Sequence, residues 1–256
     1  MSSWAADFSD NYYRRLLTAI RSRWTPCLFR DAPAVHQREP KTAFLRHDVD
    51  VSLARAVRLA RLESENGFFS TYMVMNAGLM YGLASADSRR AIRQIAALGH
   101  EVGLHFDYPD SARAAHGEAP EILESQIVQA CGELEDALGQ EVRSLSFHRP
   151  VHSVIRGPMM VAGRVNGYAA ELMERYISDS KGQWREGEPI GLLQTMDGVR
   201  TLQVLTHPIW WGESHRTAAE RLSDLVEEFA PPGSAERARF EANLAATLPG
   251  VPRGQT

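Results

Sequence analysis

The start of the chain carries apolar residues at a helical spacing. After Ser9 they recur at intervals of three and four, the spacing of one buried helix face. They are Tyr12, Tyr13, Leu16, Leu17 and Ile20. Ser9 has the short hydroxyl side chain that caps helix N-termini, so it is the expected N-cap. Residues 24–40 contain three prolines and predict a loop.

From residue 42 the pattern alternates between strand-like runs and helical stripes. Strands are expected at residues 42–49, 68–75, 100–106 and 142–147, with further strands at 172–178 and 201–206. Helices are expected after Ser52, after Asp87 or Ser88, from Pro120 to Gly139, at residues 215–230 and at residues 234–247. This alternation predicts parallel βα units, in an open doubly wound sheet or in a barrel. The tail, residues 249–256, is expected to be frayed.

Composition narrows the class of protein. The chain has 256 residues, of which 44% are hydrophobic and 23% charged, and this suits one globular domain over residues 1–256. A net charge of -4 without any run of basic residues argues against a nucleic-acid partner. Cys27 and Cys131 lie far apart in no ligand-like pattern, so both are expected to be reduced. Without a signal-like N-terminus or a run of about 20 apolar residues, the expected location is cytoplasmic, with no membrane span.

Polar residues stand where the predicted strands end. They are Asp48, Asp50, Asn76, His105, Asp107, His148, Arg149, Asp179 and His207. In a closed βα barrel the carboxyl ends of all strands meet at one rim, so these residues are expected to converge on one site. Neither GxGxxG nor GxxxxGK[ST] occurs, which removes the commonest signs of a nucleotide-binding sheet.

The residues at this rim could hold a metal ion. Asp48 and Asp50 are two positions apart, so in an extended chain both point to the same side. One could hold a cation while the other stays free as a base. A carboxylate and two imidazoles with open positions are a usual ligand set for a catalytic divalent metal, whose bound water is acidified.

Five short motifs in order resemble the polysaccharide deacetylase family, the carbohydrate esterases (family 4) with a NodB-homology domain. They are RHDVD at residues 46–50, LGHEVGLH at 98–105, SFHRP at 146–150, YISDSKGQW at 176–184 and LTH at 205–207. The resemblance implies a distorted (β/α)7-type barrel with extra N- and C-terminal helices and a motif-bearing core at about residues 42–230. The chain departs from the family in two places. Pro109 stands where a second metal histidine is usual, and Val49 separates the two aspartates.

The resemblance also implies a role for each residue. Asp50 and His105 would bind one divalent metal ion; zinc is the first choice, and iron, cobalt and manganese are alternatives. His148 is chosen as the third ligand because it ends the neighbouring strand. Asp48 would be the general base, although the reverse assignment of the two aspartates stays open. His207 would be the general acid. Arg149 would hold Asp48, and Asp179 would orient His207.

Further residues are assigned more loosely. His100 is expected to be structural, with a reserve role as a ligand if His148 fails. Trp184, Trp210 and Trp211 lie near these motifs and could offer flat faces to a sugar ring, although packing is the usual role of such residues.

Each site residue has a structural alternative. Asp50 could cap the following helix, and Asp179 could bond the neighbouring backbone as Asx-turn residues do. His148 could be a core or loop histidine, Arg149 could form a surface ion pair, and His207 could be a turn residue.

Three functions follow. The first is a metal-dependent hydrolase that removes an N-acetyl group from an amino sugar in a polysaccharide, an oligosaccharide or a sugar nucleotide, in a branch similar to the deacetylases of bacterial surface-polysaccharide (O-antigen) synthesis. The second is a non-catalytic carbohydrate-binding homologue, suggested by Pro109 in place of the usual histidine. The third is a hydrolase of the same fold acting on a non-sugar C–N bond. The terminal helices could form a homodimer surface or simply cover the barrel.

Overall fold

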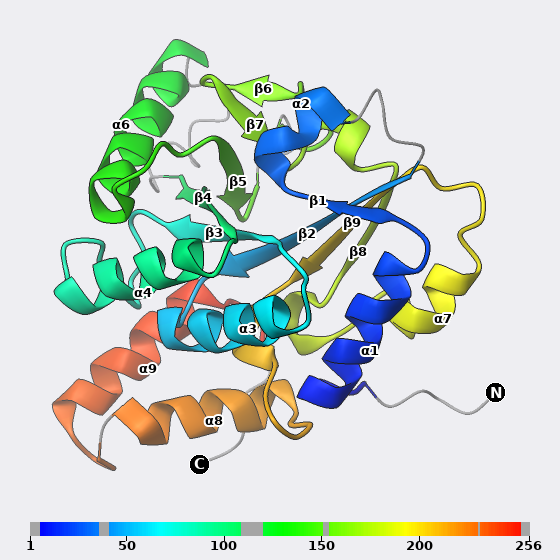
Figure 1. Cartoon of the computed structure of the whole chain (residues 1–256). Coiled ribbons are helices and arrows are strands. Elements are labelled where there is room, and N and C mark those ends of the chain that lie inside the picture. Colours follow the sequence, from blue (N-terminus) through cyan, green and yellow to red (C-terminus); the bar gives the residue numbers. More distant parts are fainter. Residues whose placement is uncertain (1–5, 36–40, 109–119, 151–153, 230, 252–256) are drawn as a thin grey trace.

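The computed structural model describes residues 6–35, 41–108, 120–150, 154–229 and 231–251. A curled, mostly parallel sheet forms a half-barrel, and helices pack along its outside (Figure 1). This α/β architecture confirms the predicted distorted (β/α) barrel.

The strands are β1 (Thr25–Cys27), β2 (Thr42–Val49), β3 (Thr71–Met75), β4 (Glu101–Asp107), β5 (Ser144–His148), β6 (Met160–Val161), β7 (Arg164–Asn166), β8 (Arg175–Ser178) and β9 (Thr201–Thr206). The α-helices are α1 (Asp10–Arg21), α2 (Ala32–Val35), α3 (Leu53–Glu65), α4 (Ala86–Ala97), α6 (Pro120–Leu138), α7 (Pro189–Gln194), α8 (Ala218–Phe229) and α9 (Ala235–Thr247). Short 3-10 turns are η1 (Phe29–Asp31), η3 (Ala170–Leu172), η4 (Ser180–Gly182) and η5 (Pro208–Trp210).

The strand order brings distant segments together. It runs β6-β7-β5-β4-β3-β2-β9-β8, and β1 pairs with the first residues of β2. All these pairs are parallel except β6 with β7. The carboxyl ends of β2, β3, β4, β5 and β9 therefore lie along the same rim, and the register sets His105 beside Met75 and His148 beside Asp107.

Alternation along each strand separates an inner from an outer face. On β2, Ala43 and Leu45 belong to the outer core, whereas Phe44 belongs to a small inner core. That inner core consists of Phe29, Ala32, Phe44, Met73, Val165, Ala169 and Leu172. It is tightly packed at Gly103, where an added Cβ would lie 2.5 Å from both Met73 Sδ and Ser144 Oγ. The outer face is buried by the apolar stripes of the surrounding helices.

Helix boundaries agree with the sequence pattern where a cap is present. Ser9 Oγ accepts a hydrogen bond from Tyr12 N at 3.2 Å, and Ser52 Oγ accepts one from Arg55 N at 3.3 Å. Both predicted N-caps are confirmed.

The start of α4 was predicted wrongly. Its N-cap is Ser85, and Asp87 lies in the first turn, where it pairs with Arg90 at 2.5 Å.

Several predicted boundaries differ from those of the structure. The predicted loop at 24–40 contains β1 and the short helix α2. The strand predicted at 68–75 begins only at Thr71, and the strand predicted at 172–178 begins at Arg175, after η3. The predicted frayed tail lies mostly outside the described residues, at 252–256.

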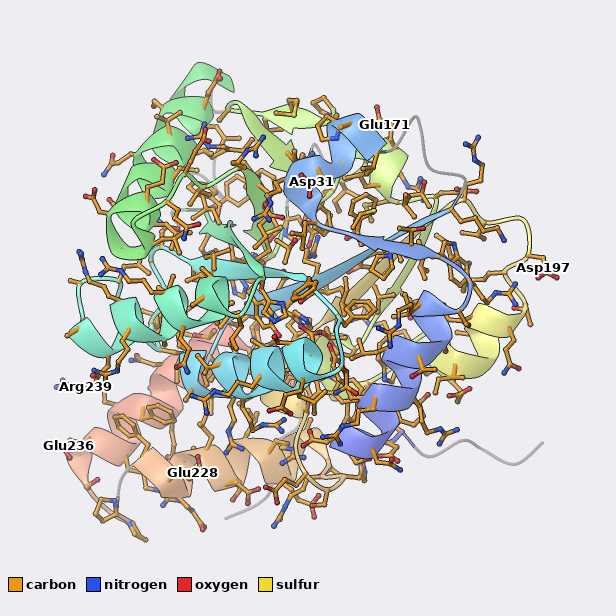
Figure 2. All side chains as sticks on the ribbon, in the orientation of Figure 1. Asp31, Glu171, Asp197, Glu228, Glu236 and Arg239 are labelled. Carbon is orange, nitrogen blue, oxygen red and sulfur yellow. The ribbon has the colours of Figure 1, made fainter. Side chains whose placement is uncertain are left out.

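The exposed faces of the outer helices carry charge. Figure 2 shows Glu228 on α8 and Glu236 and Arg239 on α9 at the periphery of the molecule, away from the sheet. Neither Cys27 nor Cys131 forms a disulfide bond. None of the described helices is both long and apolar enough to cross a membrane.

Candidate metal centre and active site

Three predicted ligands meet at the rim of the half-barrel. Asp50 lies just after β2, His105 is in β4 and His148 ends β5, so strand geometry alone aims them at one point. Their ligand atoms all lie within 4.8 Å of one another, and all three side chains are buried.

The contacts within this cluster leave room for a cation. Asp50 Oδ1 is 3.1 Å from His105 Nε2 and 3.5 Å from His148 Nδ1. Burial would raise the pKa of Asp50, but the two imidazoles outweigh it and hold the pKa well below its usual range. Asp50 Oδ1 and His148 Nε2 are buried without a hydrogen-bond partner among the described residues. Buried polar atoms are normally satisfied, so this donor set fits a divalent ion that would complete it.

A hydrogen-bond chain fixes the orientation of His105. Its Nδ1 lies 2.6 Å from Ser146 Oγ on the neighbouring strand, and Ser146 Oγ in turn donates to Asp48 Oδ1 at 3.4 Å. If Nδ1 carries the proton and donates to Ser146, the lone pair of Nε2 points towards Asp50. Such outer partners set the tautomer of a metal-binding histidine.

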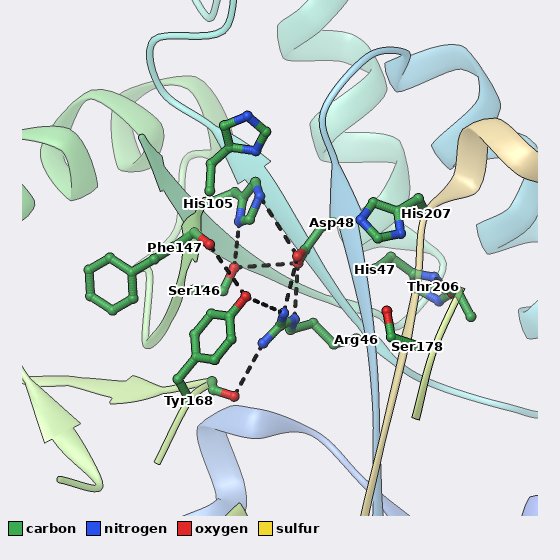
Figure 3. A network of polar contacts seen from close by, with 12 residues as sticks. Arg46, His47, Asp48, His105, Ser146, Phe147, Tyr168, Ser178, Thr206 and His207 are labelled. Carbon is green, nitrogen blue, oxygen red and sulfur yellow. Dashed lines mark hydrogen bonds and ion pairs between the residues drawn. The ribbon is translucent and has the colours of Figure 1, made fainter. Parts of the chain in front are cut away.

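Asp48 is held by an arginine inside the barrel (Figure 3). Arg46 Nε lies 3.0 Å from Asp48 Oδ1, and the same guanidinium donates to Asp48 Oδ2 at 3.1 Å. Its remaining donors reach the Gly167 carbonyl, Gln203 Oε1 and the Tyr168 hydroxyl at 3.0 to 3.2 Å. Burial works against the cation, but the charge of Asp48 outweighs it and raises the pKa of Arg46. Asp48 is thus a fixed carboxylate with a permanent cation beside it.

His207 is held on the other side of Asp50. Its Nδ1 lies 2.7 Å from Asp179 Oδ1, and its Nε2 lies 3.9 Å from Asp50 Oδ2. Asp179 is fully buried and also accepts from the His207 backbone N–H at 3.0 Å and from Trp211 Nε1 at 2.9 Å. Burial disfavours the imidazolium, but Asp179 outweighs it and raises the pKa of His207 to about 9.

The expected pairing of Arg149 with Asp48 is wrong. Arg149 donates to Asp107 Oδ2 at 3.1 Å, and its side chain is 37% exposed. Arg149 follows β5, whereas Arg46 lies two residues before Asp48 on the same face of β2, so Arg46 occupies the place beside that carboxylate.

Comparisons with known proteins found similar structures but no similar sequences. No protein-family model matches the chain, and no curated protein matches it. Among solved structures, a family 4 carbohydrate esterase from Streptomyces lividans in complex with acetate is 14% identical, with a TM-score of 0.43; 83% of this chain and 91% of that chain are covered. The deacetylase PplD from Streptococcus pyogenes, also in complex with acetate, is 11% identical, with a TM-score of 0.42 and 87% of each chain covered.

A pseudoenzyme is among the similar structures. This protein of the CE4 family, from Bacillus anthracis, is 14% identical, with a TM-score of 0.41, and covers 73% of this chain. The chain spans 60% of the length of that protein. Such distant similarity leaves the activity to be inferred from the residues of the site.

The three tryptophans pack in the interior, which was the more usual of their two considered roles, and they offer no open face to a sugar ring. Trp184, Trp210 and Trp211 are 7%, 1% and 0% exposed, because all three pack in the outer core. The polar role of Trp211 is instead to donate to Asp179. His100 is structural, as expected: it is buried away from the cluster, with Nε2 2.9 Å from the Ala60 carbonyl oxygen.

Three residues of the site went unrecognised in the sequence. Arg46 and Ser146 stand inside the quoted motifs and could have been found from alternation, because each is two positions from a predicted site residue on its own strand. Tyr168 lies in an irregular segment and carries no comparable signal. Pro109, which replaces the usual histidine, lies outside the described residues.

Proposed function

We propose that this chain is a metal-dependent hydrolase that removes the acetyl group from an N-acetylated amino sugar. A role in building a bacterial surface polysaccharide such as O-antigen belongs to the same proposal. One observation carries it: the Asp50, His105 and His148 cluster lies between a carboxylate fixed by Arg46 and an imidazole fixed by Asp179.

The roles of the residues follow from their contacts. A divalent cation held by the cluster would polarise the amide carbonyl and acidify a water molecule. Asp48 would accept a proton as the water oxygen bonds to the carbonyl carbon. His207 would donate its Nε2 proton to the nitrogen as the C–N bond breaks, and acetate and a free amine would leave.

Electrostatics support this division of labour. The Asp179 carboxylate at Nδ1 of His207 favours the protonated imidazole and raises its pKa, which is the direction that a general acid requires. Asp48 cannot rotate freely, since Arg46 and Ser146 contact its oxygens, so it would be preorganised to receive the proton.

The test is elemental analysis combined with acetate release from N-acetylated sugars. Wild type should hold about one divalent ion per chain and release acetate, whereas Asp50→Ala and His148→Ala should lose both. His215→Ala is the matched control, because this exposed histidine accepts a hydrogen bond from Phe8 N and stacks on the Phe8 ring. It should keep metal and activity.

Other outcomes would redirect the assignment. A wild-type protein that stays metal-free when divalent ions are supplied would contradict the proposal and favour a carbohydrate-binding homologue. Bound metal with turnover of small cyclic amides, and none of N-acetyl sugars, would favour the hydrolase of a non-sugar C–N bond.

A further inference from the structure

Asp50 differs from the other two residues of the metal cluster in how the backbone supports it. His105 lies within β4 and His148 is the last residue of β5, so strand pairing holds both. Asp50 lies in a bend after β2, beyond Val49, the last residue of β2 that pairs with a neighbouring strand. Pairing within the sheet therefore does not fix the position of Asp50.

The hydroxyl group of Tyr81 bridges the ends of β2 and β3. It accepts a hydrogen bond from Met75 N–H at 3.0 Å and donates one to the carbonyl oxygen of Val49. Val49 and Val74 form the last registered pair of the two strands. The hydroxyl therefore joins backbone groups of both strands at the point where their direct pairing stops.

The carbonyl group of Val49 affects the orientation of Asp50 directly. A peptide group is planar, so this carbonyl, the nitrogen of Asp50 and its Cα lie in one plane. A hydrogen bond that fixes the carbonyl also fixes that plane, and with it the direction from which the Asp50 side chain starts. Asp50 Oδ1 lies 3.1 Å from His105 Nε2, so rotation of this peptide would move the carboxylate relative to the imidazole.

The hydroxyl of Tyr81 keeps the proton that this bridge requires. Burial raises its pKa, the bond from Met75 N opposes the rise, and the charges of Asp50 and Asp48 add to it. The proton is donated to Val49, and the oxygen accepts from Met75, so both capacities of the hydroxyl are used within the protein. Tyr81 is thus suited to orient the site and not to exchange a proton with a substrate.

The segment that carries Tyr81 is itself anchored on both sides. Asn243 Nδ2, on α9, donates to the Leu79 carbonyl at 3.1 Å. Arg89 Nε, on α4, donates to the Leu83 carbonyl at 3.2 Å. The ring of Tyr81 is half-buried and packs against the outer core. Its hydroxyl is therefore held close to its two backbone partners.

We propose that Tyr81 is a positioning residue for the metal cluster. By fixing the peptide between Val49 and Asp50, its hydroxyl sets the direction in which the Asp50 carboxylate meets the two imidazoles. Outer partners of metal ligands typically contribute about 10–100-fold to metal affinity. The inference rests on the proposed metal-dependent function and adds a residue that lies outside all five sequence motifs.

The first experiment is a metal titration of Tyr81→Phe, which removes the hydroxyl and keeps the ring. Zinc and cobalt(II) would each be titrated into the metal-free wild type and variant, and the cobalt absorption spectrum would report the geometry of the ligands. Tyr81→Phe should weaken the Kd for both ions by about tenfold or more and change the cobalt spectrum. An unchanged Kd and spectrum would overturn the proposal.

Tyr72→Phe is the matched control. It also removes a buried hydroxyl from β3, one that donates to Glu63 Oε2 at 2.8 Å, and Glu63 is no part of the metal cluster. This variant should lose thermal stability and keep the wild-type Kd and cobalt spectrum. Equal weakening of metal binding in both variants would indicate a general loss of structure and contradict a specific role of Tyr81.

A variant farther from the site allows for poor folding of Tyr81→Phe. Asn243→Ala removes the solvent-exposed hydrogen bond that ties α9 to Leu79, and so loosens the same segment from outside. It should weaken the Kd in the same direction as Tyr81→Phe but less. If Tyr81→Phe does not fold, an unchanged Kd in Asn243→Ala would overturn the proposal.

Crystal structures of metal-free wild type and Tyr81→Phe test the positioning without any metal. In the variant the Asp50 carboxylate should move away from His105, and an unchanged contact of 3.1 Å would overturn the proposal. If the wild type binds neither zinc nor cobalt, the proposed metal-dependent function fails. These two structures would then still decide whether Tyr81 positions Asp50.

Discussion

Strand β2 carries a buried charged cluster on each of its two faces, and the two differ in how complete they are. On the inner face, Arg46 and Asp48 form an ion pair next to Asp50. There, Asp50 Oδ1 and His148 Nε2 are buried without a hydrogen-bond partner among the described residues. On the outer face, His47 pairs with Glu63 at 2.9 Å, and both side chains are fully buried. The side chains on both faces are buried, so what separates the candidate metal site from the structural cluster is whether the polar atoms are satisfied within the protein.

The outer group, which we call the Glu63 cluster, is closed on itself. It consists of Tyr13, His47, Glu63, Ser70, Tyr72 and His100. Both Glu63 oxygens accept hydrogen bonds, from Tyr13 on one side and from Ser70 and Tyr72 on the other. The cluster therefore needs no ligand, and its role is to join α1 and α3 to the sheet.

The two faces are nevertheless connected. His47 Nδ1 lies 2.6 Å from Thr206 Oγ1, which links β2 to β9. The next residue after each, Asp48 and His207, points inward with a proposed proton-transfer role. The outer cluster thus helps to hold the two strands that carry the proposed base and the proposed acid.

The largest expected effect distinguishes the two aspartates of the inner face. Asp48→Asn should lower kcat by about 10²–10⁴ through loss of the base and keep the metal. Asp50→Asn should lose metal as well as activity. Metal content and acetate release would be measured on both, with Asp197→Asn, an exposed partner of Arg23, as the control.

The reverse result would exchange their roles. If Asp48→Asn loses the metal and Asp50→Asn keeps it, Asp48 is the ligand and Asp50 the base. Melting curves recorded beforehand would separate either effect from misfolding, because Asp48→Asn leaves the Arg46 cation without its partner.

The convergence of the predicted ligands on the inner face could be predicted from the sequence for a physical reason. Strand alternation places Asp48 and Asp50 on one side, and parallel topology brings His105 and His148 to the same rim. A helix cap such as Ser9 depends only on residues within a few positions of it, so it too could be predicted from the sequence. Those inferences need only the spacing of apolar and polar residues along the chain and the direction of the strands.

What could not be predicted depends on contacts far apart in sequence. The partners of Arg46 at Gly167 and Tyr168 are more than 120 residues away, in an irregular segment. The short strands β6 and β7 have two and three residues, too few to show a period. Nearness of Trp210 to a motif in sequence could not decide between packing and a sugar-facing role, because it does not determine burial.

The second prediction concerns how the stability contributed by the Glu63 cluster depends on pH. Burial opposes ionisation of Glu63, but His47, His100 and Ser70 outweigh it and lower its pKa to about 2. The ordinary value is 4.5. Because the folded pKa is depressed, this stabilisation is present above pH 4.5 and is lost as pH falls towards 2. The change should be on the order of 3 kcal/mol in the free energy of unfolding.

Denaturant unfolding of wild type and Glu63→Gln at a series of pH values measures this contribution. Glu63→Gln should be less stable at neutral pH and should lack the acid-dependent part of the wild-type curve. Parallel curves for the two proteins would show that Glu63 does not supply it. Ser64→Ala, on the same helix and outside the cluster, is a control that should keep the wild-type slope, since its hydroxyl only donates to the Leu98 carbonyl.

The smallest loss of stability and activity is expected at Arg149. The sequence suggested that this arginine holds Asp48, but in the structure Arg46 does so. Arg149→Lys keeps a cation beside Asp107 in a partly exposed pair, so stability should change by less than about 1 kcal/mol. The same substitution at Arg46 removes a two-point contact with Asp48 inside the barrel, and should cost about 3–5 kcal/mol and most of the activity. Unfolding free energies and kcat of the two variants would be compared side by side. Equal losses of stability and activity in the two variants would contradict this prediction. The exposed Arg149 would then matter as much as the buried Arg46, and the ion pair between Arg46 and Asp48 would have no special role.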